Sequence, residues 1–356
     1  MQALSAADAV APSIHRTRNY LFRPFELGTY LKLCLVAVIT EGIGGNFHVP
    51  GGGGSHGHTQ SHPHPGPHLA FSPPMIAIII AAIALAIVVT IAIYYLITRL
   101  RFAFFHCLVR QTKEIAPGWR LYRNQANRFF ALNLVVGIIF VLLLGIIVLP
   151  FVIGIVHLVR GTPPGAHMNI GAFLGYLVPL IPIVLLAILV AIAIQIVLRD
   201  FMLPHMALEN ASAGEAWAAV RAHIVAEKGD FFVYTLLRIV LPIVGLIAVF
   251  MVLLIPGLIL LGCAAVVFVA LHSAFAQATG SAAVAGIMLQ VLIGIVVFCI
   301  LVLLGIIIGG PLSVWVRTYA LMFYGGRYTA LGDVLTLSTP PPSPPPPGPA
   351  FGTAPF

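Results

Sequence analysis

Long stretches without charged side chains constrain this sequence more than any other feature. Five stretches are long and nearly free of charge: residues 75–97, 131–159, 169–198, 231–275 and 276–316. The fourth contains Arg238, and the other four contain no charged residue. A helix of about 20 apolar residues crosses the bilayer, because each residue adds about 1.5 Å against a hydrocarbon core of about 30 Å. The sequence therefore predicts several membrane-spanning helices.

The composition excludes the common alternatives. Apolar residues make up 60% of the chain and charged residues 8%, with a mean hydropathy of +1.06. Soluble domains are about 45–50% apolar and about 25% charged. The net charge of +8 comes from basic residues between apolar stretches, where they orient membrane proteins, so nucleic acid is not an expected partner. We predict an all-α fold, a polytopic transmembrane helical bundle.

The distribution of basic residues predicts the topology. Residues 27–47 contain Lys32 and Glu41, and we interpret them as a first spanning helix; a re-entrant or interfacial helix is the alternative. With that helix, 16 of the 18 basic residues fall on one side, Arg160 falls on the other and Arg238 lies inside. The positive-inside rule then predicts about six spans in the cell (inner) membrane, with both termini cytoplasmic.

Residues 231–275 leave two alternatives open. The stretch is long enough for two spans, with Pro256-Gly257 as the break. Two spans there would make seven and would put Arg317 and Arg327 outside. We favour one span at residues 231–255, followed by a re-entrant or outer-leaflet helix at residues 258–275.

A weak internal repeat indicates three helical hairpins. The second helix of each expected hairpin ends in a similar way, with RFAFF from Arg101, RDFML from Arg199 and RTYAL from Arg317. A tryptophan follows the first two arginines at the same spacing of 18 residues. The connectors between hairpins are predicted to be amphipathic cytoplasmic helices. In one of them Ser212 and Glu215 match a capping box, and Ala216, Trp217 and Val220 share a face.

The expected domain organisation has three parts. Residues 1–26 form a cytoplasmic N-terminal segment, and residues 27–330 form the transmembrane helical domain, with a Gly-, His- and Pro-rich outer loop at residues 48–73. Residues 331–356 form a Pro-rich cytoplasmic tail, which we expect to be disordered polyproline II. A protein partner for the tail and a homo-oligomer are left open.

The outer loop is the one chemically suggestive segment. Six histidines fall within it: His48, His56, His58, His62, His64 and His68. Neutral imidazole is a good ligand for zinc, copper and nickel. No cysteine or carboxylate accompanies these histidines, and a flexible loop loses entropy on binding. A weak metal site is therefore one interpretation and a tolerated low-complexity insertion is the other; no other cofactor is expected.

Several arginines are candidates for contact with anionic lipid headgroups. Arg238 is the one ionised side chain well inside an apolar stretch, and the nearest carboxylates on its own helix are Asp230 and Glu227. Snorkelling to a headgroup is the favoured interpretation, with a substrate or transport role as the alternative. The complete set of candidate headgroup contacts is Arg101, Arg120, Arg123, Arg199, Arg238 and Arg317.

Part of the sequence resembles a known kind of membrane protein. Residues 199–209 read RDFMLPHMALE, residues 214–217 read GEAW and residues 230–234 read DFFVY. This pattern is similar to uncharacterised prokaryotic six-helix membrane proteins, which include relatives of the membrane domain fused to some glycerophosphodiester phosphodiesterases. The surface-helix motif is one residue shorter here. The resemblance covers roughly residues 101–324 and implies a helical inner-membrane protein without the catalytic domain.

The sequence thus favours a non-enzymatic function, a structural or lipid-associated membrane module. A transporter or permease, with a metal ion captured by the His-rich loop, is the second interpretation. A membrane enzyme acting on lipids is the third. It would need His106, Asp200, His205 and Glu209 to meet at the cytoplasmic face.

Overall fold

The computed structural model describes residues 3–43, 73–161, 170–276 and 279–337. Helices account for 91% of these residues, and no strand occurs among them. The long helices are α3 (Pro73–Arg110), α5 (Arg123–Gly161), α6 (Ile170–Ile196), α9 (Lys228–Phe275) and α10 (Ser281–Gly325). The short helices are α1 (Val10–Phe22), α2 (Leu27–Val38), α4 (Ile115–Leu121), α7 (Leu203–Leu208), α8 (Ala213–Ala226) and α11 (Thr329–Leu337). Two π-helical segments, η1 (Ile39–Ile43) and η2 (Val197–Met202), complete the fold.

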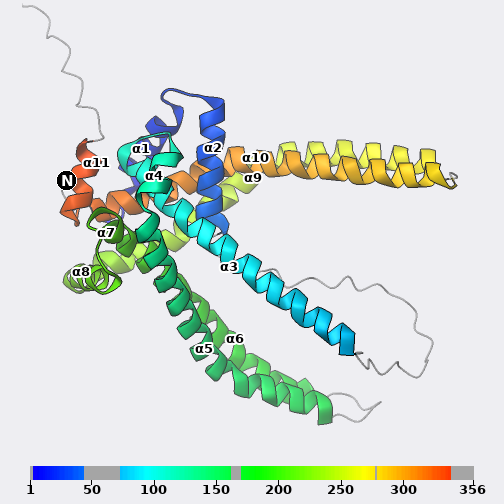
Figure 1. Cartoon of the computed structure of the whole chain (residues 1–356), viewed down its shortest axis with the longest axis horizontal. Helices are drawn as coiled ribbons and strands as arrows, with labels where there is room; N and C mark the ends of the chain where they lie inside the picture. The colour runs from blue at the N-terminus through cyan, green and yellow to red at the C-terminus, as the bar shows by residue number, and fades with distance from the viewer. Residues whose placement is uncertain (1–2, 44–72, 162–169, 277–278, 338–356) are drawn as a thin grey trace, which may run out of the picture.

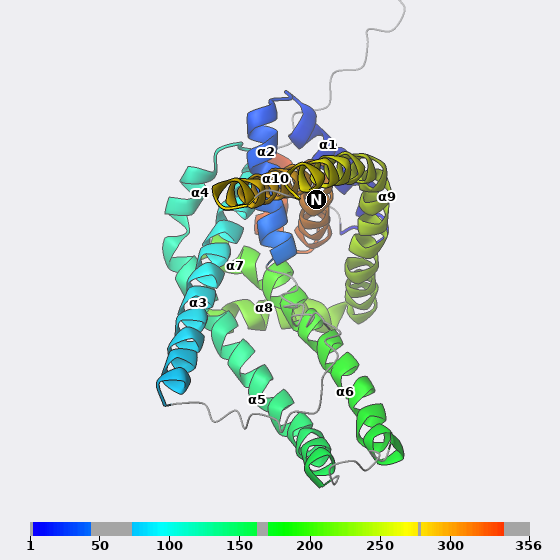
Figure 2. The same cartoon turned by 90° about the vertical axis from the view of Figure 1, so that its right-hand side faces the viewer.

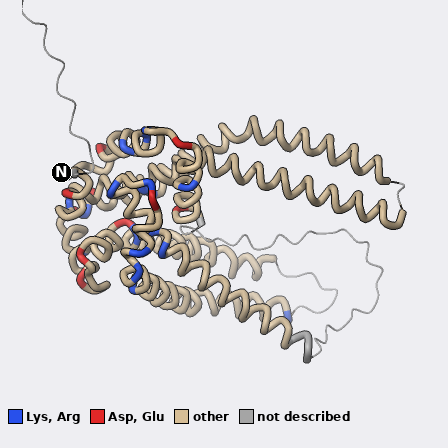
Figure 3. The backbone as a smooth tube through the Cα atoms, turned by 45° about the horizontal axis from the view of Figure 1, so that its top comes forward, with Lys and Arg blue, Asp and Glu red and all other residues tan. Residues whose placement is uncertain are grey.

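The molecule has two parts, which we call the head and the arms. The head consists of the short helices and the ends of the long helices that meet them (Figure 1). The arms are the remaining lengths of the long helices: α3, an antiparallel pair of α5 and α6, and an antiparallel pair of α9 and α10 (Figures 1 and 2). Charged residues gather in the head, whereas the arms are almost free of them (Figure 3).

The head contains the packed core. Buried apolar side chains fall within residues 6–37, 97–129, 196–234 and 314–335, so all of them lie in or beside the head. Aromatic rings fill its centre, where the ring of Tyr234 stacks on that of Phe323 with centroids 4.3 Å apart. Stacked aromatic pairs add about 0.5–1.5 kcal/mol beyond the burial of their area. The head is therefore held together like a soluble domain.

The arms are apolar and uncovered by protein. Five helices are long and apolar enough to cross a membrane: Ala77–Arg110, Arg123–Gly161, Ile170–Leu208, Lys228–Phe275 and Ser281–Gly325. In each of the five helices, the most hydrophobic segment is not covered by the protein at all. Apolar surface on this scale needs an apolar solvent, which a bilayer supplies. The prediction of a multi-pass helical membrane protein is confirmed.

The expected break at Pro256-Gly257 is wrong. Helix α9 continues from Lys228 to Phe275, so residues 258–275 are its distal part rather than a separate helix. A proline removes only one backbone hydrogen bond, and membrane helices tolerate this where a neighbouring helix supports them, as α10 does here. With 48 residues, α9 is about 72 Å long, more than twice the thickness that one upright crossing needs.

The ends of the transmembrane domain also differ in detail. The described part of the first expected span comprises the 12 residues of α2 and the five of η1, and it is not among the five long apolar helices. Residues 44–47 lie outside the described residues. At the other end, α11 carries the fold to Leu337, with Leu331 and Leu335 fully buried in the head. Ordered structure therefore extends past the boundary expected at residue 330.

The connector helix α8 confirms the predicted capping box. The Ser212 hydroxyl accepts a hydrogen bond from the backbone N–H of Glu215 at 3.3 Å. In return, the backbone N–H of Ser212 donates to the Glu215 carboxylate at 2.7 Å, which lowers the pKa of that carboxyl. Ala216 and Val220 are buried as expected, whereas Trp217 is 47% exposed and does not share their environment.

Candidate functional site

A buried cluster of ionised side chains lies where the arms enter the head. At its centre is Asp200 of η2, which is 1% exposed. Its Oδ2 accepts hydrogen bonds from Arg238 Nε at 2.8 Å and from the Tyr234 hydroxyl at 2.9 Å. Its Oδ1 accepts one from Arg317 Nη1 at 2.7 Å. Helices α9 and α10 are thereby tied to η2 through one carboxylate.

A second carboxylate joins the cluster from the N-terminal part of the chain. Glu41 of η1 forms an ion pair with Arg199, and its Oε2 accepts from Arg238 Nη2 at 3.2 Å. Both carboxylates thus stand on π-helical segments. Such segments are rare and occur frequently at functional sites, because the extra residue per turn redirects side chains. We call Arg101, Arg199, Arg238, Arg317, Glu41 and Asp200 the arginine cluster.

The arginine cluster carries an excess of positive charge. Three of its guanidinium groups, those of Arg199, Arg238 and Arg317, form ion pairs with only two carboxylates, a formal excess of one positive charge in a buried site. Arg199 Nε and Arg317 Nη2 are buried and have no hydrogen-bond partner within the described part of the chain. A buried charge without full compensation is costly. The cluster therefore favours an additional negatively charged group.

Three of these arginines come from the predicted repeat. Arg101, Arg199 and Arg317 end the second helix of each expected hairpin, and the structure brings them together. Arg317 Nη1 also donates to the backbone oxygen of Arg199 at 3.0 Å, and Arg101 Nε donates to that of Thr40 at 3.4 Å. Arg101 lies within electrostatic range of Arg317 and of Asp200. Similar helix ends from three parts of the chain thus converge on one site.

The remaining candidate headgroup contacts lie elsewhere. Arg120 and Arg123 are exposed around the end of α4 and the start of α5. Arg101, Arg199 and Arg317 are between 2% and 7% exposed, and the side chain of Arg238 is 8% exposed. Sequence reasoning placed all six at a lipid surface and did not anticipate the burial of four. Headgroup contact stays a prediction for each of them.

The partners of Arg238 differ from those considered from the sequence. Asp230 and Glu227, the carboxylates at the start of its own helix, bind Arg327 instead, each at 2.6 Å. Arg238 binds Asp200 and Glu41, which are distant in the sequence. One signal could have found them, because charges within apolar segments of membrane proteins usually pair with one another.

A cavity of about 440 Å³ opens beside the cluster. Its polar lining comes from Glu41, Arg199, Asp200 and Arg238, with Gln195 and Ser313 nearby. Its apolar lining comes from Ile192, Ile196, Ile239, Pro242, Ile243, Leu246, Leu312 and Val316. The cavity therefore has a charged wall and an apolar wall.

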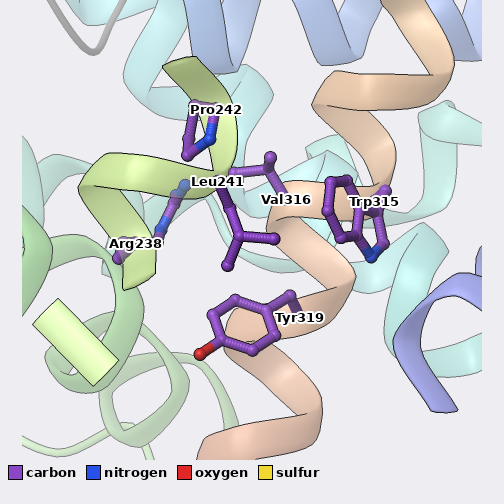
Figure 4. Close-up of a pocket in the computed structure, with 6 residues that line it drawn as sticks. All are labelled: Arg238, Leu241, Pro242, Trp315, Val316 and Tyr319. Atoms are coloured by element: carbon purple, nitrogen blue, oxygen red, sulfur yellow. The ribbon is translucent and has the colours of Figure 1, made fainter. Parts of the chain in front are cut away.

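A second crevice lies on another side of Arg238, between α9 and α10. Figure 4 shows Arg238, Leu241 and Pro242 on α9 facing Trp315, Val316 and Tyr319 on α10. These side chains leave almost no free space between the two helices. Trp315 is further fixed, because its Nε1 donates to the Ser13 hydroxyl at 2.9 Å. The larger cavity is therefore the side on which Arg238 has room for a ligand.

Of the four residues expected for a lipid-acting enzyme, only His205 and Glu209 meet. His205 lies between Tyr324, whose hydroxyl is 2.7 Å from Nε2, and Glu209, whose Oε2 is 3.3 Å from Nδ1. His106 packs against Tyr122 instead, and Asp200 belongs to the arginine cluster. His205 is 3% exposed, and its ring lies tilted against that of Tyr328 with the centroids 4.0 Å apart. This arrangement stabilises the head but offers no shared site for the four side chains.

The predicted metal ligands cannot be placed. His48, His56, His58, His62, His64 and His68 all lie outside the described residues. In the part of the chain that is described, no group of three or more His, Cys, Asp or Glu side chains could hold a metal ion. Zinc, copper or nickel binding by the His-rich loop stays a prediction.

Comparison with known proteins gives a family without an assigned activity. No curated protein and no solved structure matches this chain at a significant level. One family model does match, described as "Family of unknown function (DUF7544)", and it covers residues 4–334. That range includes all five arms, every residue of the arginine cluster and the head except the end of α11. The chain therefore belongs to this family of unknown function, DUF7544.

Proposed function

We propose that this chain is a non-enzymatic, lipid-associated module of the inner membrane. In this proposal the arms lie in the hydrocarbon core and the head lies on the cytoplasmic side. The observation that carries it is the segregation of the molecule into uncovered apolar arms and a head that holds nearly all the charged residues. Such a molecule presents basic and aromatic groups to lipid headgroups wherever the arms enter the bilayer.

The orientation is supported by charge and by connectivity. The described chain begins and ends in the head, and Arg160, near the tip of α5, is the one basic residue at the far end of an arm among the described residues. Helix α2 lies in the head, whereas α3 begins at the tip of its arm. Since these two helices lie at opposite ends of the arms, the first crossing expected from the sequence and the five arms would together give six crossings and a cytoplasmic head.

The non-enzymatic part of the proposal is supported by the chemistry of the cavity. Its two carboxylates are engaged by arginines, which makes them poor general bases. Ser313, the one hydroxyl among the described lining residues, donates to the backbone oxygen of Gly309 of its own helix. The resemblance to the membrane domain of some glycerophosphodiester phosphodiesterases would agree with a module that lacks catalysis, and it stays a prediction.

Thiol labelling of the protein in vesicles tests the placement of the arms. Cys263 and Cys299 are exposed on the arms, whereas Cys34 and Cys107 are buried in the head. A water-soluble maleimide should leave all four unmodified in vesicles and should react with them after unfolding in SDS. The matched control is Asn124→Cys, at an exposed position of the head, which should react in intact vesicles of mixed orientation. Modification of Cys263 or Cys299 in intact vesicles would overturn the proposal.

Two further measurements on the same vesicles test the function itself. The phospholipid composition, followed by mass spectrometry during incubation, should stay constant, and lipid turnover would contradict the non-enzymatic assignment. A zinc-sensitive dye trapped inside should report no zinc entry above that of empty vesicles. Zinc entry that is lost when the six loop histidines are changed to alanine would favour the transporter interpretation instead.

A further inference from the structure

We propose that the cavity between α6, α9 and α10 binds one anionic phospholipid. Its phosphate would lie against Arg199 and Arg238, and an acyl chain would follow the apolar wall toward the arms. This inference rests on the proposed function, since it names the lipid with which the module associates. It also identifies a particular site, rather than a general affinity of a basic surface for lipid.

The charge of the arginine cluster selects for an anion. Arg199, Arg238 and Arg317 share two carboxylates, a formal excess of one positive charge, and the Asp200 carboxylate already accepts from three donors. Arg199 lines the cavity, is 7% exposed and leaves its Nε without a partner among the described residues. Guanidinium groups bind phosphate through two parallel hydrogen bonds, which is the geometry that a lipid phosphodiester offers. A phosphate at this wall would compensate the excess charge.

The polarity of the cavity changes along the helix axes in one direction. On α9 the chain runs from head to arm, and Arg238 comes before Ile243 and Leu246. On α6 the chain runs toward the head, and Ile192 comes before Arg199 of the following η2. On both sides of the cavity, therefore, the charged wall faces the head and the apolar wall faces the arms. A phospholipid has the same polarity when its headgroup lies at the interface and its chains lie in the bilayer.

The cavity is open to the lipid side and has a suitable size. Ile243 and Leu246 line it and yet are 53% and 63% exposed, so the apolar wall continues into the uncovered surface of α9. The volume of about 440 Å³ falls within the range of about 300–1,000 Å³ that is usual for small-molecule sites. The cavity can therefore hold a headgroup and the adjoining part of a chain, while the remainder lies among bilayer lipids.

The test is native mass spectrometry of the full chain in detergent, titrated with phosphatidylglycerol or with phosphatidylcholine. Phosphatidylglycerol should bind one molecule per chain about tenfold more tightly than phosphatidylcholine, a difference of about 1.4 kcal/mol. Inorganic phosphate, as a separate competitor, should displace the lipid weakly, because it lacks a chain for the apolar wall. Equal binding of both lipids would overturn the inference. Equal competition by phosphate would show a free-anion site instead.

Matched variants on neighbouring positions keep the test independent of folding. Leu246→Trp fills the apolar wall without touching the charges and should weaken phosphatidylglycerol about tenfold. Ile247→Trp is the control: it is adjacent on the same helix and similarly exposed, but it does not line the cavity. Equal affinities of the two variants would overturn the site.

A charge variant completes the design. Arg199→Gln should remove the preference for phosphatidylglycerol, and Arg199→Lys should restore part of it, in protein whose circular dichroism is unchanged. If Arg199→Gln does not fold, the comparison of the two tryptophan variants decides. Thiol labelling of Cys263 and Cys299 reports membrane insertion separately. Failure of this inference therefore leaves the proposed function standing, and failure of insertion would remove both.

Discussion

The head and the arms differ in what covers their apolar side chains. In the head, side chains from residues 6–37, 97–129, 196–234 and 314–335 cover one another. In the arms, exposed residues such as Ile146 (71% exposed) and Phe298 (66% exposed) are left for the lipid. The head also encloses the arginine cluster, whereas the arms enclose no charge among the described residues. Packing within the protein stabilises the head, and the solvent stabilises the arms.

This difference determines where a substitution will be felt. In the head, a lost contact is not replaced, because the interior is close-packed and shielded from water and lipid. In the arms, a changed side chain exchanges one lipid contact for another, and the unfolded chain in the membrane has similar contacts. We therefore expect stability to be concentrated in about half of the chain. The variants below test this comparison, measured as free energies of unfolding in mixed micelles of mild detergent and SDS.

The largest effect is expected from Asp200→Asn. The amide cannot balance Arg238 and Arg317, and it can accept through only one oxygen where the carboxylate uses two. Breaking a buried ion pair by removing one partner costs about 3–5 kcal/mol. Asp333→Asn, at an exposed position of α11, is the control and should leave stability nearly unchanged. A loss below 1 kcal/mol for Asp200→Asn would mean that the cluster is solvated and that the head is not closed.

A pair of leucine truncations compares the two parts directly. Leu203→Ala removes a fully buried side chain of the head and should cost about 2–5 kcal/mol. Leu292→Ala makes the same chemical change on α10, where the side chain is 56% exposed, and should cost well under 1 kcal/mol because lipid fills the space. Similar losses for both would indicate that the arms pack against other protein, for example a second copy of the chain.

Two glycines of α10 should respond with opposite signs. A Cβ on Gly310 would lie 2.3 Å from Cys34 Cβ and 3.0 Å from its Cα, so Gly310→Ala forces α2 and α10 apart. We expect a loss of about 1–3 kcal/mol. A Cβ on Gly305 would meet nothing within 4 Å, so Gly305→Ala should gain about 0.5–1 kcal/mol from helix propensity. A gain for both variants would contradict the close contact of α2 with α10.

The sequence was sufficient for the arms and for their membrane environment. Charge-free stretches have a length and composition with one physical solution, so α3, α5, α6 and α10 could be predicted from them. The continuity of α9 could not, because Pro256 is compatible with both a break and a tolerated kink. The partner helix α10 decides between them, and it is a tertiary contact. Helix α11 was missed because its buried leucines depend on tertiary packing, in which α11 contacts α10, α3 and α7.

The candidate site was only partly predictable. The sequence singled out Arg101, Arg199, Arg238 and Arg317, since each interrupts or ends an apolar stretch. It did not show that they converge, because their contacts join residues as far apart as Glu41 and Arg238. The repeat of three arginines at helix ends was the usable signal. Equivalent ends of hairpins that enter one head lie near one another. Arginines brought together in this way need a carboxylate between them to balance their charge.

The smallest effect is expected from a second ion network of the head, and it sharpens the comparison. Asp230 binds Arg327 at 2.6 Å, as closely as the pairs around Asp200, but its side chain is 48% exposed. Arg327 also keeps Glu227 and the ring of Phe323, 4.1 Å from its guanidinium carbon. Asp230→Asn should therefore cost about 0.2–1 kcal/mol, and raising the salt concentration should reduce that cost further. The expected small cost would show that burial determines how much an ion pair of the head contributes to stability. A cost equal to that of Asp200→Asn would show that location in the head is sufficient.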